Sequence, residues 1–163
     1  MFRGKMTDKN KHTMLYTDGS CNTKFRTGAW VAIIFIDGQK NILQGIEHDT
    51  THQRMELRGI IESMKWLIQH HPDKSDVHLF TDSQYVVNLP ARKAKLVNQR
   101  FTTSKKELIS NADLIEEFYK VIGCFQLQIE KVKAHEKKRD DVYNGNREAD
   151  RLCRKAVRNE LNN

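Results

Sequence analysis

LYTDGS at residues 15–20 and LFTDSQ at residues 79–84 are two versions of one phrase, an apolar strand-like run that meets a Thr-Asp pair. Each aspartate, taken alone, fits an ordinary turn or helix cap. A long helical pattern separates the phrases, and a strand, helix and strand in succession predict a parallel pair with a right-handed crossover. Asp18 and Asp82 would then lie at the same carboxyl edge of an open sheet, where ligands bind in such folds.

The residues around the first phrase predict an antiparallel start to the sheet. Strand-like runs occupy residues 14–21, 28–36 and 41–48, with Asp37-Gly38 as the hairpin turn between the last two. The loop-like residues 22–28 already connect the first two strands. We therefore expect Asp18 to lie near the end of its own strand.

A helix is predicted to begin after Thr50 or Thr51, either of which can serve as the N-cap. Its apolar residues recur at helical spacing, and they are Leu57, Ile60, Ile61, Met64, Leu67 and Ile68. Glu56 lies at the edge of this stripe, so its carboxylate can face along the surface of the sheet.

The second half of the chain predicts three more elements after the helix-like residues 83–89. They are a helix over residues 111–123 with Asn111 as its cap, a fifth strand over 125–134, and a last helix over 147–161. The predicted buried stripe of the last helix consists of Ala149, Leu152, Cys153 and Ala156, with Asp150 at its edge. The fold class is therefore α/β, a mixed five-stranded sheet of three antiparallel and then two parallel strands, flanked by helices.

Length and composition favour one domain over residues 14–161, preceded by a flexible basic leader over residues 1–13. No run of about 18 apolar residues occurs, and the leader lacks the apolar core of a signal peptide. We therefore expect a soluble, cytoplasmic protein without membrane contact, and a monomer, since no long apolar surface stripe is left over. The three cysteines show no C-x-x-C spacing, which argues against disulfides and zinc.

The net charge of +7 is concentrated locally. Residues 92–106 hold six Lys or Arg and no acidic residue. A basic patch on an otherwise balanced domain is typical of a protein that binds a polyphosphate. A solvated helix face is the alternative for this segment alone.

Four carboxylates share one kind of position, beside an apolar strand end or an apolar helix stripe. They are Asp18, Glu56, Asp82 and Asp150. Any one of them fits a cap or a partner of a helix dipole. Gathered together they would repel one another unless cations were present, and oxygen ligands select Mg²⁺ or Mn²⁺. Two such ions would balance four carboxylates and support phosphodiester hydrolysis.

With these motifs in view, the chain resembles the type 1 ribonucleases H, which cut the RNA strand of RNA/DNA hybrids. The resemblance runs from about Met14 to Leu161. It is carried in order by YTDGSC, TTHQRMELRGI, TDSQYV, VKAH and NGNREADRL. It implies a ribonuclease H-like fold, two Mg²⁺ ions for which Mn²⁺ can substitute, and an RNA/DNA hybrid as partner.

The resemblance also implies roles for single residues. Asp18, Glu56, Asp82 and Asp150 would bind the metal ions, and His135 would assist proton transfer or product departure, although a solvated loop histidine is the alternative. Substrate contacts would come from the backbone of Gly19 and Cys21 and from the side chains of Thr51, His52, Gln53 and Gln84. A basic protrusion over residues 89–106, with Lys93, Lys95 and Arg100, would hold the DNA strand.

The chain departs from the family pattern at several of these contacts. His52 and Gln53 replace a frequent pair of asparagines, Lys24 replaces a frequent asparagine, and the protrusion has only Phe101 where tryptophans are usual. Two rival functions remain open: another nuclease on the same scaffold, such as a junction resolvase, and a module that binds hybrid without cutting it.

Overall fold

The two Thr-Asp phrases lie on adjacent parallel strands. The computed structural model describes residues 12–133 and 144–163. In that part of the chain the elements are β1 (Thr13–Asn22), β2 (Thr27–Ile36), β3 (Gln39–Glu47), α1 (His52–His70), β4 (Asp76–Thr81), α2 (Gln84–Asn98), α3 (Ala112–Ile122), β5 (Gln126–Lys131) and α4 (Gly145–Leu161).

The strands form one sheet in the order β3-β2-β1-β4-β5. β1 pairs antiparallel with β2, and β2 pairs antiparallel with β3, whereas β1 pairs parallel with β4 and β4 pairs parallel with β5. The predicted fold class, a mixed five-stranded sheet flanked by helices, is confirmed. The register sets Tyr16 beside Phe80, so the two Thr-Asp pairs follow the last paired residues of β1 and β4 at the same level, and Asp18 stays paired with Val31 of β2.

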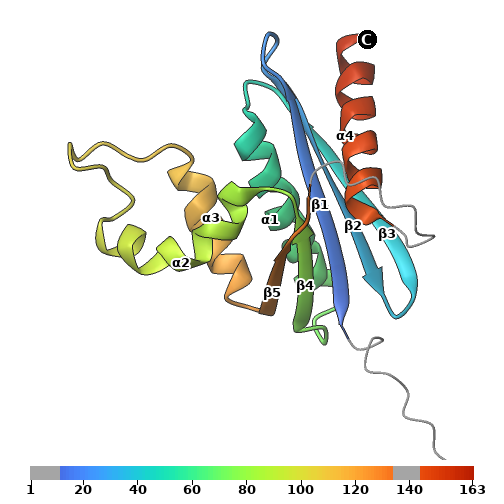
Figure 1. Cartoon of the computed structure of the whole chain (residues 1–163), viewed down its shortest axis with the longest axis horizontal. Helices are drawn as coiled ribbons and strands as arrows, with labels where there is room; N and C mark the ends of the chain where they lie inside the picture. The colour runs from blue at the N-terminus through green and yellow to red at the C-terminus, as the bar shows by residue number, and fades with distance from the viewer. Residues whose placement is uncertain (1–11, 134–143) are drawn as a thin grey trace, which may run out of the picture.

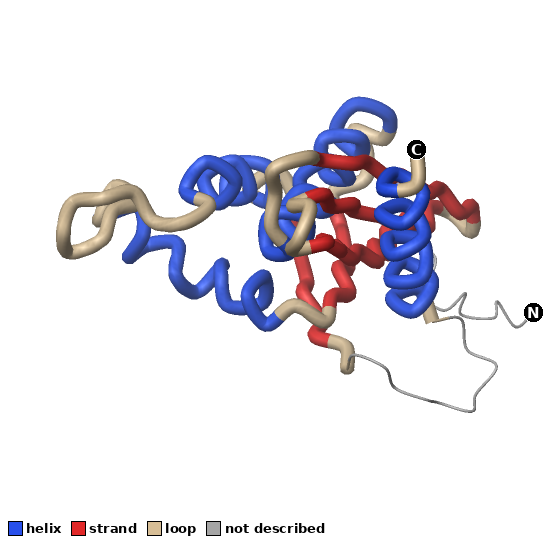
Figure 2. The backbone as a smooth tube through the Cα atoms, turned by 90° about the horizontal axis from the view of Figure 1, so that it is seen from above, coloured by secondary structure: helices blue, strands red, loops and turns tan. Residues whose placement is uncertain are grey.

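The helices cover the two faces of the sheet unequally. Figures 1 and 2 show α1, α2 and α3 on one face and α4 alone on the other. The larger core lies under the three helices and includes Leu15, Ile34 and Leu79 from the strands. A smaller cluster, which joins Val31 and Ile33 to Ala149 and Cys153, holds α4 against β2. None of the helices in residues 12–133 and 144–163 combines the length and hydrophobicity of a membrane span.

Several element boundaries differ from the prediction. β1 continues to Asn22 beyond Asp18, because its antiparallel hairpin with β2 is longer than its parallel pairing with β4. α2 extends to Asn98 through Pro90, which is exposed. β5 ends at Lys131, three residues earlier than predicted.

Two predicted buried stripes also need correction. Ile68 is 42% exposed, so the buried stripe of α1 ends at Leu67. In α4, Val157 is buried, whereas Leu152 and Ala156 are only partly buried. The helix therefore presents Ala149, Cys153 and Val157, at successive intervals of four residues, to the sheet.

Candidate active site

The two strand-borne acids lie at one edge of the sheet, as the repeated phrase predicts. Asp18 lies two residues after Tyr16 in β1, and Asp82 follows β4 directly. The backbone N–H of Gly19 donates to Asp18 Oδ1 at 2.9 Å. The parallel register therefore brings two acids that are 64 positions apart in the sequence to the same level, just beyond the last residues that pair β1 with β4.

Helix α1 adds a buried glutamate next to these aspartates. Thr51 caps the helix, its side chain accepting from the N–H of Arg54, and Glu56 lies in the following turn. A Cβ atom at Gly19 would lie 2.5 Å from the backbone nitrogen of Glu56. Only glycine therefore allows β1 to approach α1 this closely, and the close approach sets Glu56 beside Asp18.

Glu56 has a partner on each oxygen. Ser83 Oγ donates to Oε2 at 2.6 Å, and His52 Nε2 lies 3.0 Å from Oε1. Ser83 also caps α2, since its hydroxyl accepts from the N–H of Val86. One serine therefore fixes both the start of α2 and the orientation of the buried carboxylate.

Helix α4 brings the fourth acid from the opposite face of the sheet. The thiol of Cys153 lies 3.2 Å from the carbonyl oxygen of Asp18, which ties α4 to β1. Burial raises the pKa of this thiol, so it stays protonated and can donate. Asp150, one turn earlier on α4, accepts from Arg154 Nε at 2.9 Å.

The pKa values of the two aspartates respond to the other acids of the site. Burial, followed by the charges of Asp82 and Asp150, raises the pKa of Asp18 to about 7. Burial and then the charge of Glu56 raise the pKa of Asp82, with Asp150 contributing less. The predicted acids are therefore brought together as one coupled negative group.

The donor chemistry of this group suits a hard divalent cation, because all four acids offer oxygen. The raised pKa values of Asp18 and Asp82 mark negative charge that is incompletely compensated by the protein. In residues 12–133 and 144–163, however, no three His, Cys, Asp or Glu side chains are already arranged as a metal site. The acids are thus coupled in charge but not preassembled as ligands.

Most of the predicted substrate contacts lie at the starts of α1 and α2, around the acids. Thr51, His52 and Gln53 are exposed at the start of α1, and Gln84 is exposed at the start of α2. Lys131 Nζ donates to Gln84 Oε1 at 2.6 Å. Cys21 is partly buried, with its thiol 3.6 Å from the carbonyl oxygen of Thr50. Whether these groups contact a substrate remains a prediction.

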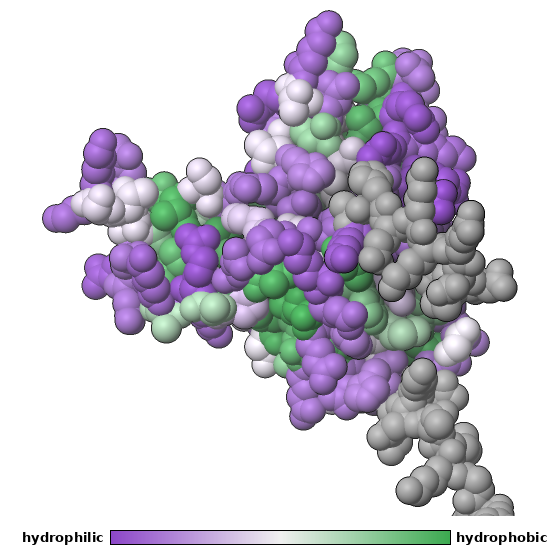
Figure 3. Space-filling view, viewed as in Figure 1, coloured by the Kyte–Doolittle hydropathy of each residue, from purple (hydrophilic) through white to green (hydrophobic). Residues whose placement is uncertain are grey.

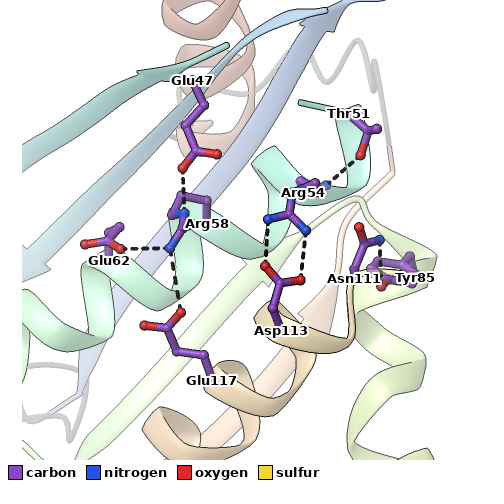
Figure 4. Close-up of polar contacts among 9 residues, drawn as sticks. All are labelled: Glu47, Thr51, Arg54, Arg58, Glu62, Tyr85, Asn111, Asp113 and Glu117. Atoms are coloured by element: carbon purple, nitrogen blue, oxygen red, sulfur yellow. Dashed lines mark hydrogen bonds and ion pairs between the residues drawn. The ribbon is translucent and has the colours of Figure 1, made fainter. Parts of the chain in front are cut away.

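A polar network beside the site joins α1, α2 and α3 (Figure 4). Arg54 makes two hydrogen bonds to Asp113, and this pairing lowers the pKa of Asp113 to about 2. Asn111 precedes α3 with a left-handed φ of 62° and makes no side-chain cap. Its amide instead lies 3.3 Å from Tyr85 Oη and 3.5 Å from Gln53 Oε1, so its predicted capping hydrogen bond is absent.

The same network includes a second arginine, Arg58, one turn after Arg54 on α1. Arg58 Nε lies 2.6 Å from Glu47 Oε1, and its Nη1 faces Glu62 and Glu117 (Figure 4). Because Glu47 ends β3 and Glu117 belongs to α3, this arginine links the sheet to the third helix. The network fixes the helix that carries Glu56.

The basic segment lies on a projection from the body of the molecule. α2 and the loop after it extend away from the sheet, and Figure 3 shows hydrophilic side chains at the outer edge. Lys93, Lys95 and Arg100 are exposed there. Within residues 12–133 and 144–163 none of the three forms an ion pair with a carboxylate, although Lys93 Nζ lies 5.8 Å from the ring centre of Tyr119. His135 lies outside the described residues.

Comparison with known proteins identifies the family. A sequence model described as RNase H matches residues 10–158. The chain belongs to the RNase H family. The predicted resemblance is confirmed, and the chain is thereby placed in a family of enzymes.

Curated relatives within the RNase H family cover most of the chain. The chain is 37% identical over 127 residues to "Ribonuclease H" of Caldicellulosiruptor saccharolyticus, covering 77% of this chain and 85% of the relative. It is 32% identical over 158 residues to "Ribonuclease H" of Caldanaerobacter subterraneus subsp. tengcongensis, covering 96% and 97%. "Ribonuclease H" of Wolbachia pipientis wMel is 33% identical over 148 residues, covering 90% and 96%.

A solved structure agrees on the RNase H fold. The crystal structure of LC9-RNase H1, described as "a type 1 RNase H with the type 2 active-site motif", superposes with a TM-score of 0.73 at 24% identity. The superposition covers 91% of this chain and 72% of that chain.

Three residues of the site were missed from the sequence: Ser83, Asn111 as a link between helices, and Arg154. The contact of Arg154 could have been predicted from the sequence, because residues four apart on a helix are neighbours and Arg154 follows Asp150 by four positions. The contacts of Ser83 and Asn111 could not, since their partners Glu56 and Gln53 lie 27 and 58 positions away.

Proposed function

We propose that the chain is an endonuclease that hydrolyses the RNA strand of RNA/DNA hybrids. The observation that carries the proposal is the coupled group of Asp18, Glu56, Asp82 and Asp150 in a chain of the RNase H family. Two bound Mg²⁺ ions, or Mn²⁺ in their place, would supply charge stabilisation of the attacking and leaving oxygens. The four carboxylates would hold these ions.

The chemistry is an attack of water on the phosphorus of a ribonucleotide linkage. The new bond forms between the water oxygen and phosphorus, and the bond from phosphorus to the 3′ oxygen breaks. The products carry a 5′-phosphate and a 3′-hydroxyl. The imidazole of His135 would pass a proton to the departing 3′ oxygen.

Substrate selection would depend on groups around the acids. The 2′-hydroxyl distinguishes RNA from DNA at a site, and it can both donate and accept hydrogen bonds. Thr51, His52, Gln53 and Gln84 offer exposed polar side chains at two helix starts. Lys93, Lys95 and Arg100 on the projection would hold the phosphates of the DNA strand.

One assay separates this function from its rivals. Labelled RNA/DNA hybrid, duplex RNA, duplex DNA, four-way DNA junctions and single strands are incubated with and without Mg²⁺. We expect Mg²⁺-dependent cleavage of the hybrid alone. Cleavage of junctions instead would identify a resolvase, and binding of hybrid without cleavage would identify a non-catalytic module.

Asp82→Asn tests the role of the acids directly. We expect it to lower the turnover of hybrid by at least about 100-fold, because a metal-binding oxygen is lost while the shape is kept. Binding of hybrid should persist. Asp76→Asn is the matched control, since it removes the same charge from the opposite end of β4. Full activity of Asp82→Asn would contradict the assigned role.

A further inference from the structure

The two helix-borne acids share a feature that the strand-borne acids lack. His52 stands four residues before Glu56 on α1, and Arg154 stands four residues after Asp150 on α4. His52 Nε2 lies 3.0 Å from Glu56 Oε1, and Arg154 Nε lies 2.9 Å from Asp150 Oδ1. Within residues 12–133 and 144–163, neither Asp18 nor Asp82 has a side-chain cation as an ion-pair partner.

The side chains of His52 and Arg154 can move away from their acids without disturbing the core. The side chains of His52 and Arg154 are 59% and 56% exposed, whereas Glu56 is buried. The serine hydroxyl on Glu56 Oε2 belongs to the cap of α2, so it is fixed. His52 therefore occupies the carboxylate oxygen that could be released most easily to a ligand. An imidazole N–H makes this contact in either protonation state of the ring.

The position of these pairs gives them an electrostatic role. Four carboxylates gathered at one site repel one another, which destabilises the metal-free protein. The imidazole and the guanidinium each partner one of the two acids that the helices bring in.

We propose that His52 and Arg154 are exchangeable internal partners of the metal-binding acids, which release Glu56 and Asp150 when a divalent cation binds. This inference depends on the metal site of the proposed function and adds its regulation. Both are positioning residues. The two pairs stabilise the metal-free fold, and they weaken metal affinity because each pair must break before the metal binds.

The test measures metal binding and stability without nucleic acid. Mn²⁺ is titrated into the full chain, and the free ion is followed by electron paramagnetic resonance. We expect Arg154→Gln and His52→Asn each to bind Mn²⁺ roughly two- to five-fold more tightly, the range that exposed ion pairs support. The same variants should unfold at a lower temperature in EDTA and gain more from added Mn²⁺ than the unaltered chain.

Matched variants separate the ion pairs from general charge. Arg151→Gln removes the same charge from an exposed position of α4, and His71→Asn removes a histidine at the other end of α1. Both should leave Mn²⁺ affinity unchanged. Arg154→Lys keeps a cation within reach of Asp150 and should restore the original affinity.

The variants should bind Mn²⁺ more tightly and yet unfold at a lower temperature in EDTA. A purely structural role of His52 and Arg154 would not produce this combination. Unchanged or weaker Mn²⁺ binding in both Arg154→Gln and His52→Asn would overturn the inference, as would an equal gain in Arg151→Gln. If the unaltered chain cleaves hybrid and binds Mn²⁺ but these variants bind it no better, the inference alone fails. If the unaltered chain neither binds Mn²⁺ nor cleaves hybrid, the proposed function fails with it.

Discussion

At the scale of single residues, Asp18 is subject to opposing effects on its charge. It is pushed toward the neutral form by burial and by Asp82 and Asp150, while the N–H of Gly19 opposes this. Its pKa of about 7 lies well above the ordinary value of an aspartate, so the metal-free carboxylate takes up a proton far more readily than an exposed aspartate does. The charged form of Asp18 therefore destabilises the folded protein, and such perturbed acids are typical of functional positions.

This destabilisation predicts a pH-dependent stability in EDTA. A folded-state pKa raised above the unfolded value means that the folded protein binds more protons, so its free energy of unfolding falls as pH rises. For Asp18 the fall is on the order of 4 kcal/mol between about pH 4 and pH 7. The raised pKa values of Asp82 and His52 act in the same direction.

Urea unfolding at a series of pH values measures this effect, with Asp18→Asn as the comparison. The variant should lose the Asp18 part of the decline and be more stable than the unaltered chain near pH 8. An identical pH profile for the two proteins would show that Asp18 titrates normally in the folded state.

At the scale of elements, close contacts at glycine decide where the acids lie. Gly19 brings α1 against β1, and Gly145 brings the start of α4 against the ring of Tyr16. Tyr16 in turn stacks on Phe80 of β4, with ring centres 4.7 Å apart. The position of Asp150 therefore depends on how closely the first turn of α4 can approach the sheet.

Gly145→Ala should displace α4, because the added Cβ would collide with the Tyr16 ring. We expect a loss of about 1–3 kcal/mol in the free energy of unfolding and a clear loss of hybrid cleavage. Gly59→Ala is the control, since its Cβ would meet only ordinary contacts, the nearest at 3.5 Å. Equal stability of the two variants in urea would show that α4 accommodates the methyl group.

At the scale of the whole molecule, charge is distributed unevenly. The acids lie at the sheet edge, while the projection of α2 and its following loop carries exposed cations. The six Lys and Arg residues within 92–106, with no acid among them, favour a long anionic partner over a small one. The fold separates the part that would hold nucleic acid from the part that would cut it.

Neutralising Lys93, Lys95 and Arg100 together should raise KM for hybrid more than it lowers kcat. The salt dependence of KM should also weaken, by up to about 3 in the slope of log KM against log salt concentration. Replacing Arg151, Lys155 and Arg158 of α4 removes the same total charge elsewhere and serves as the control. A fall in kcat with unchanged KM would contradict a holding role for the projection.

The sequence by itself determined the order of strands and helices and the parallel pairing of the two Thr-Asp phrases, and it predicted the set of four acids. These follow from hydrophobic periodicity and from local chemistry, which are properties of neighbouring residues. The ends of the helices were harder to predict from the sequence. α2 was expected to stop before Pro90, but it continues through this residue to Asn98.

Only the tertiary structure decided which groups hold each acid. Ser83 reaches Glu56 across 27 positions, the thiol of Cys153 reaches Asp18 across 135, and Gly145 is required by a ring in β1. The raised pKa of Asp18 likewise depends on burial and on acids from other segments. Such properties depend on distances through space between segments far apart in the chain, and no local pattern encodes them.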